Sequence, residues 1–288
     1  MPDPTFAMFL RLFRVVCGLL LLNLPLLPAH AQSHGNSKWA SLRLFQAEHQ
    51  ADGSFWGGLE IALNPHVKTY WRTVGEAGLP PRFDWSASDN LADLTLAWPR
   101  PIRFEDGGGQ SIGYDKTVLL PFLIKPINPQ KPVTLDLTID YAVCEKLCLP
   151  QHDRIKLVFD ANKSPAPELV QALHHALALV PQKRDLGSSA HPSIERVINE
   201  SDMIRIDTRL DPDSRIEDVF VEGPDGWVFA APILLQGPEN GRQSFLVSVL
   251  ERPHRDDQLA NLTLSVTLVT RNLSSETVLT LDKQGRAP

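Results

Sequence analysis

Alternation of apolar and polar residues, repeated along most of the chain, is the feature that most limits how this sequence can fold. The clearest run is VTLDLTIDYAV (133–143), in which the odd-numbered residues are apolar or aromatic and most even-numbered ones are polar. The same period of two recurs in LEIALNP (59–65), ADLTLAW (92–98) and RIKLVFD (154–160). Side chains alternate between the two faces of a strand, so each run predicts a half-buried β-strand. Prolines outnumber glycines, 24 to 17, which favours an all-β chain with many turns.

One segment has helical spacing instead. In APELVQALHHALALV (166–180), Leu169, Leu173 and Leu177 recur at four-residue intervals, and a proline near the start suits the first turn of a helix. We interpret residues 161–190 as a helical linker that ends a first β-sandwich domain, residues 32–160. Short apolar runs beyond the linker, from MIRIDTRL to ETVLTLD, predict a second β-sandwich over residues 191–288.

The first 31 residues predict a secretory signal peptide. Arg11 and Arg14 precede the apolar run VVCGLLLLNLPLLP, which ends at Ala29-His30-Ala31, a small-residue cleavage pattern. The run is broken by an asparagine and a proline and is shorter than the roughly 20 residues that a membrane-spanning helix needs. A retained anchor is the alternative interpretation. We expect cleavage after Ala31 and a periplasmic product whose mature chain is not inserted in the membrane.

The acidic charge of the chain argues against nucleic acid as a partner. The full sequence carries a net charge of −6, and loss of Asp3, Arg11 and Arg14 with the signal peptide leaves about −7. Cys17 is removed with the same segment, so Cys144 and Cys148 are the two cysteines expected in the mature chain. Exported proteins meet an oxidising compartment, in which two such thiols either pair or are kept reduced by dedicated enzymes.

The spacing of Cys144 and Cys148 requires a bend between them. Residues four apart on a straight strand lie roughly 13 Å apart, whereas a disulfide needs Cα atoms within about 7 Å. We therefore expect a tight turn through residues 145–147, between two strands. The alternation also places Cys144 on the polar face of its strand, so we expect neither cysteine in the buried core.

A disulfide that closes so small a ring removes little entropy from the unfolded chain, so structural stapling is a weak reason for it. A short, accessible ring suits thiol–disulfide exchange, in which a thiolate attacks one sulfur and the second cysteine later releases the mixed disulfide. Two alternatives stay open at this point: a structural disulfide, and binding of soft Cu(I) by the two sulfurs.

Three segments together resemble a known family. NPHVKTYWRTVGEAGLPPRFDW (64–85), WPRPIRFEDGGGQSIGYDKTVLLP (98–121) and YAVCEKLCLP (141–150) are similar, in that order, to the amino-terminal periplasmic domain of the disulfide reductase DsbD, and especially to its relatives in the copper-sensitivity ScsB group. The resemblance covers roughly residues 39–160. It implies an immunoglobulin-like sandwich, distinct from a thioredoxin fold, that relays electrons through a cysteine pair without a cofactor.

The resemblance also implies partners and site residues. Cys144 and Cys148 become the redox pair, which takes electrons from a membrane-embedded donor and passes them to thioredoxin-like periplasmic proteins. Full-length DsbD carries its own membrane relay and thioredoxin domain, so here we expect the donor to be a separate protein. The family has a cap loop over its cysteines, and Glu105 and Asp106 fall where it has acidic cap residues.

The remaining candidates lie beside these positions. The aromatic cap residue of the family has no clear counterpart in EDGGGQSIGY, so Ile112 and Tyr114 are candidates for it. Tyr70 and Trp71 are interpreted as packing residues, with direct contact to a redox partner as the alternative. The expected function is that of a protein-disulfide reductase or interchange component. A copper-binding or copper-tolerance protein and a non-catalytic adaptor with a structural disulfide are the alternatives.

Overall fold

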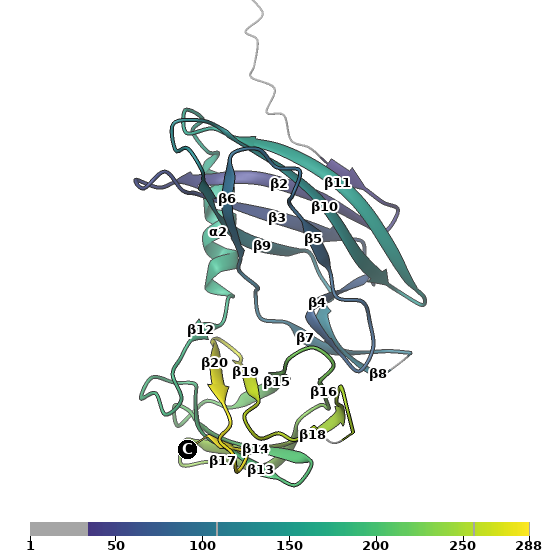
Figure 1. The fold of residues 1–288 in the computed structure, drawn as a ribbon, viewed down its shortest axis with the longest axis vertical. Coiled ribbons are helices and arrows are strands. Elements are labelled where there is room, and N and C mark those ends of the chain that lie inside the picture. The colour runs from purple at the N-terminus through teal and green to yellow at the C-terminus, as the bar shows by residue number, and fades with distance from the viewer. Residues whose placement is uncertain (1–33, 108, 256, 288) are drawn as a thin grey trace, which may run out of the picture. The chain divides into compact units, whose positions relative to one another are not determined.

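The computed structural model describes residues 34–107, 109–255 and 257–287, so the predicted signal peptide, residues 1–31, lies outside the described residues. Within these ranges the chain forms layered, almost entirely antiparallel sheets, and α2 (Pro167–Ala178) is the only helix (Figure 1). The predicted all-β fold is therefore confirmed. None of the described residues belongs to a helix long and apolar enough to cross a membrane.

Two sheets form the first sandwich. The first sheet has the order β1 (His34–Asn36), β2 (Ala40–His49), β3 (Phe55–Leu63), β9 (Val118–Pro126) and β6 (Leu91–Leu96). The second has the order β11 (Cys148–Phe159), β10 (Val133–Cys144), β4 (Lys68–Gly75), β8 (Gly109–Tyr114) and β7 (Ile102–Asp106), with β5 (Arg82–Asp84) also paired to β10. All of these pairings are antiparallel, as is typical of an immunoglobulin-like sandwich.

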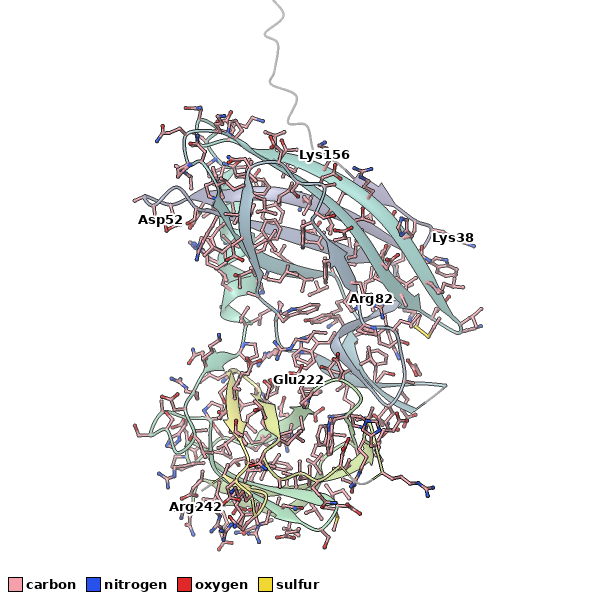
Figure 2. The ribbon with its side chains drawn as sticks, in the orientation of Figure 1. Lys38, Asp52, Arg82, Lys156, Glu222 and Arg242 are labelled. Carbon is pink, nitrogen blue, oxygen red and sulfur yellow. A yellow bond between two sulfur atoms is a disulfide. The ribbon has the colours of Figure 1, made fainter. Side chains whose placement is uncertain are left out.

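The alternation in β10 builds the core of this sandwich. All six odd-numbered residues from Val133 to Val143 are buried, and they belong to one core cluster with apolar side chains of β2, β3 and β9 from the facing sheet. Figure 2 shows side chains filling the space between the sheets. Each fully buried leucine or isoleucine contributes roughly 1.5–3 kcal/mol through loss of apolar surface from water. The even-numbered Asp136 is buried as well, because Arg154 and Lys156 of the neighbouring strand hold its carboxylate.

The helix predicted within the linker is present and has a packing role. The apolar stripe of α2 lies against β2 and β9, where Leu173 is fully buried beside Phe45 and Ala47. Trp56 and Leu119 complete this cluster. The helix therefore covers the outer face of the first sheet, so that residues 167–178 belong to the packing of the first sandwich.

Two further sheets form the second sandwich. The third sheet has the order β12 (Gln182–Lys183), β20 (Ser274–Thr280), β19 (Thr263–Thr270) and β15 (Ile216–Glu222). The fourth has the order β16 (Val228–Phe229), β18 (Arg242–Glu251), β14 (Met203–Arg209), β13 (Ser193–Glu200) and β21 (Arg286–Ala287), with β17 (Ile233–Glu239) paired to β18. A separate core of buried aliphatic residues and phenylalanines fills the space between them.

The two sandwiches belong to one compact unit, Gln32–Pro288. Phe220 of β15 and Val269 of β19 join the core cluster of the first sandwich. One face of the third sheet is thereby used for contact between the two sandwiches.

Candidate functional site

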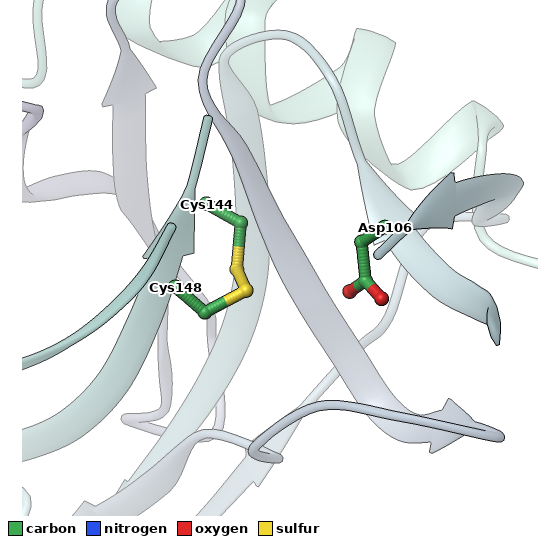
Figure 3. Close-up of side chains that lie close together, drawn as sticks. All are labelled: Asp106, Cys144 and Cys148. Carbon is green, nitrogen blue, oxygen red and sulfur yellow. A yellow bond between two sulfur atoms is a disulfide. The ribbon is translucent and has the colours of Figure 1, made fainter. Parts of the chain in front are cut away.

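The cysteine pair closes the end of the hairpin formed by β10 and β11. Cys144 and Cys148 are direct cross-strand partners with Cα atoms 4.1 Å apart, and their sulfurs form a disulfide (Figure 3). The three residues between them are exposed. This is the bend that the spacing required.

The two cysteine residues differ in exposure. Cys148 is exposed, and its neighbour Leu147 presents 71% of its surface to solvent. Cys144 is only 3% exposed, so the expectation that neither cysteine is buried is wrong. The reason is a distant segment: β4 pairs beside the end of β10, with Lys68 opposite Cys144, and its Tyr70 side chain packs against Cys144 together with Phe104.

Tyr70 of β4 contacts both sulfurs. Its Oη lies 3.0 Å from Sγ of Cys144 and 3.1 Å from Sγ of Cys148. The same hydroxyl lies 2.7 Å from Oδ2 of Asp106. A tyrosine hydroxyl has one proton to donate, and disulfide sulfurs have none. In the oxidised protein the Tyr70 hydroxyl therefore donates its hydrogen bond to the Asp106 carboxylate, and its oxygen faces the sulfurs.

The environment of Tyr70 keeps its hydroxyl protonated. Burial first, and then the hydrogen bond and negative charge of Asp106, raise the pKa of Tyr70 well above its ordinary value. A loop residue makes the close packing of this ring possible: Gly78 has φ 131°, and a Cβ there would lie 2.4 Å from the Tyr70 ring. Only glycine takes that conformation at so short a distance from a neighbouring side chain.

Asp106 comes from the end of β7 and reaches the site through the β7–β8 hairpin (Figure 3). Besides the Tyr70 hydroxyl, Oδ2 accepts a hydrogen bond of 2.8 Å from Oγ of the buried Ser111. Ser111 also contacts the carbonyl of Ala77 at 2.8 Å, so one hydroxyl links the hairpin to the loop after β4. The acidic residue is thus held in a fixed position beside the disulfide.

Phe104 lies with Tyr70 over Cys144, and we call these two side chains the cover of the disulfide. A small cluster contains Tyr70, Ala142 and Cys144, with Phe104 and Val74 packed against it. The rings of Phe104 and Tyr70 lie 6.3 Å apart. Sequence reasoning missed Phe104, although an aromatic residue directly before Glu105 and Asp106 was the available signal.

The other residues singled out from the sequence lie away from the sulfurs. Ile112 and Tyr114 are buried in the main core, and the Tyr114 hydroxyl donates to the Pro99 carbonyl at 2.8 Å. Trp71 is fully buried in the same core. Glu105 is exposed, and its carboxylate accepts a hydrogen bond from Gln110. The structure therefore brings Asp106 and Tyr70 to the cysteines, and leaves these four side chains outside that cluster.

The same cluster offers donor atoms for a metal. One oxygen of Asp106 and the two sulfurs lie within 4.8 Å of one another. The sulfurs become ligands only after reduction, because thiolates are the metal-binding form of cysteine. Two thiolates suit a soft ion such as Cu(I), whereas a carboxylate oxygen suits harder ions.

Comparison with known proteins points to one family. Residues 40–160 match the sequence model of the family described as "Thiol:disulfide interchange protein DsbD, N-terminal". Among solved structures, the chain is similar to the N-terminal periplasmic domain of ScsB from Proteus mirabilis, with 21% sequence identity and a TM-score of 0.68. That match covers 86% of this chain and 95% of the ScsB domain, so both sandwiches share its fold. No curated protein matches the sequence.

Proposed function

Because residues 40–160 match the sequence model of the DsbD N-terminal family, we propose that this chain is a periplasmic thiol–disulfide exchange protein that relays electrons through Cys144 and Cys148. The proposed donor is a membrane-embedded reductase, and the proposed acceptors are thioredoxin-like periplasmic proteins. The observation that carries the proposal is the difference between the two cysteine residues: Cys148 is exposed and Cys144 is buried beneath Tyr70 and Phe104.

In the first half of the cycle the disulfide is reduced. A donor thiolate attacks Sγ of Cys148, the bond between the two cysteines breaks, and its electron pair stays on Sγ of Cys144. A second donor thiolate then attacks the donor sulfur of the mixed disulfide and releases Cys148. Two electrons and two protons have entered the pair, and the donor carries the new disulfide.

In the second half the reduced pair delivers its electrons. The Cys148 thiolate attacks a disulfide of the thioredoxin-like acceptor, and Cys144 then attacks Cys148, releases the acceptor as a dithiol and restores the disulfide. The Tyr70 oxygen, 3.0 Å from Sγ of Cys144, is placed to accept a hydrogen bond from the buried Cys144 thiol while the hydroxyl proton stays directed at Asp106. Asp106 orients that hydroxyl.

A redox titration tests this proposal. The protein is equilibrated with buffers of decreasing potential, its thiols are labelled, and its fold is followed by circular dichroism. We expect both cysteines to become labelled while the sandwich signal is retained. Cysteines that stay oxidised until the fold melts would support the structural disulfide instead.

Binding of Cu(I) is the second candidate, because the two sulfurs and Asp106 lie so close together. Competition of the reduced protein against a Cu(I) chelator separates the two functions. If exchange is the function, folding and reaction with a thiol partner do not require copper. Tight one-to-one binding that is abolished by Cys144→Ser or Cys148→Ser would favour the copper candidate.

A further inference from the structure

One face of the third sheet presents a row of acidic side chains. Asp218, Phe220 and Glu222 alternate along β15, so they lie on the same face. Phe220 pairs with Thr267 of β19, which in turn pairs with Glu276 of β20. The three carboxylates and the phenylalanine thus form one patch, which contacts β4 and β7 of the first sandwich.

Arg72 of β4 joins two of these carboxylates. Its Nε and Nη2 donate to the two oxygens of Glu222 at 2.9 and 2.6 Å, and Nη2 also donates to Glu276. The next residue, Thr73, donates to Glu222 at 2.6 Å. The Glu222 and Glu276 side chains are only 12% and 14% exposed, so this cluster of three charges is largely shielded from solvent. Burial disfavours the charge on Arg72, but the two carboxylates outweigh it and raise the pKa of Arg72.

Arg103 of β7 makes the second connection. Its guanidinium contacts both oxygens of Asp218 at 3.2 Å and donates to the Val219 carbonyl at 3.1 Å. Its Cζ also lies 5.0 Å from the centre of the Phe220 ring. Phe220 in turn packs against Trp71, with ring centres 5.9 Å apart. Ionic and aromatic contacts therefore hold the same short stretches of β4 and β7.

These anchors are adjacent in sequence to the cover of the disulfide. Arg72 follows Tyr70 by two residues, and Arg103 directly precedes Phe104. A shift of either strand would move the Tyr70 hydroxyl or the Phe104 ring relative to Cys144, because both side chains pack against that cysteine. The contacts with the second sandwich are thus two residues from Tyr70 on β4 and one residue from Phe104 on β7.

We propose that the second sandwich braces the cover of the disulfide, with Arg72 and Arg103 as positioning residues that anchor β4 and β7 to Asp218, Glu222 and Glu276. The brace keeps the Tyr70 hydroxyl against both sulfurs and Phe104 over Cys144, and so limits the access of small thiols to the Cys144–Cys148 bond. This inference gives the second sandwich a role. It concerns the accessibility of the disulfide and does not depend on which protein exchanges electrons with it.

The rate at which dithiothreitol reduces the folded protein tests the brace. Glu222→Gln removes one charge of the patch without touching the cover, and we expect reduction to become about fivefold faster as β4 opens more often. Glu222→Asp keeps the charge and is expected to restore most of the slow rate. Hydrogen exchange of residues 68–75 and 102–106 should increase in the Gln variant only.

Glu195→Gln is the matched control. Glu195 also accepts hydrogen bonds from two arginines, Arg209 and Arg242, but lies in the fourth sheet, away from this patch. Its variant should reduce at the wild-type rate. If Glu222→Gln does not fold, Asp218→Asn tests the Arg103 anchor in the same assay. Reduction rates of Glu222→Gln and Asp218→Asn equal to that of Glu195→Gln would overturn the proposal, even if exchange with a thioredoxin-like protein is observed.

Discussion

Replacement of Tyr70 by phenylalanine removes a single hydroxyl from the centre of the site. That hydroxyl donates to Asp106 and lies against both sulfurs, while the ring packs within the cover. Tyr70→Phe keeps the ring, so the change isolates the hydrogen bonds. We expect a loss of stability and a shift of the disulfide potential.

The size of both effects follows from the contacts. A hydrogen bond to a charged group contributes about 1.5–3 kcal/mol. Asp106 is only half-buried and keeps its bond from Ser111, so we expect the lower end, a loss of about 1.5 kcal/mol. In the reduced protein the Tyr70 oxygen also accepts a hydrogen bond from a cysteine thiol, which contributes about 0.5–1 kcal/mol. Its loss disfavours the reduced form, which lowers the midpoint potential by about 10–20 mV.

Tyr141→Phe is the matched control for this variant. The Tyr141 hydroxyl donates to Asp153 at 3.0 Å in the same sandwich, and its contacts do not include the sulfurs. Denaturant unfolding gives the two stabilities, and equilibration with glutathione buffers gives the two potentials. Both variants should lose stability, but only Tyr70→Phe should change the potential. Equal potentials for Tyr70→Phe and the wild type would refute the assignment of the Tyr70 hydroxyl to the sulfurs.

Three further predictions concern the fold around the site. Gly113→Ala should prevent folding or strongly lower the melting temperature, because a Cβ there would lie 2.0 Å from the Thr69 carbonyl oxygen. A near-native melting temperature would contradict this packing. Leu173→Ala should lower the free energy of unfolding by about 2–4 kcal/mol, since Leu173 is fully buried between α2 and the first sheet; a loss well below that range would mean that the helix is loosely held. All three tyrosines have a raised pKa, chiefly through burial, so their contribution to stability is complete below the unfolded value of about 10 and is lost as the pH rises further. Ultraviolet absorbance should show tyrosinate only as the protein unfolds, and tyrosinate in the folded protein near that pH would contradict the burial.

The local sequence pattern was sufficient to predict the strands and the turn between the two cysteines. The alternation in residues 133–143 predicted the buried odd-numbered face of β10, because strand periodicity is a property of neighbouring residues. It misplaced Cys144, because burial of that residue depends on β4, which arrives from about 75 residues earlier in the chain. A contact between distant segments leaves no periodic signal in either of them.

Contacts between distant segments also explain what the sequence did not predict about the cover and the helix. Ile112 and Tyr114 were candidates because they follow the acidic residues, but their side chains fill the main core, while Phe104 takes the place beside Cys144. The periodic leucines of residues 166–180 predicted a helix with an apolar stripe, but the stripe does not specify which surface it covers. The interpretation of residues 161–190 as a helical linker that ends the first domain therefore did not specify that α2 packs on the first sheet.

Trapping of mixed disulfides tests the central proposal most directly. Each cysteine is replaced singly by serine, and the two variants are incubated with an oxidised thioredoxin-like protein. Since Cys148 is exposed and Cys144 is buried, Cys144→Ser should accumulate a covalent complex through Cys148, and Cys148→Ser should form none. Trapping through Cys144 alone, or equally through both cysteines, would contradict the assigned order of attack. If neither variant forms a complex with such a partner, the result would contradict exchange as the function.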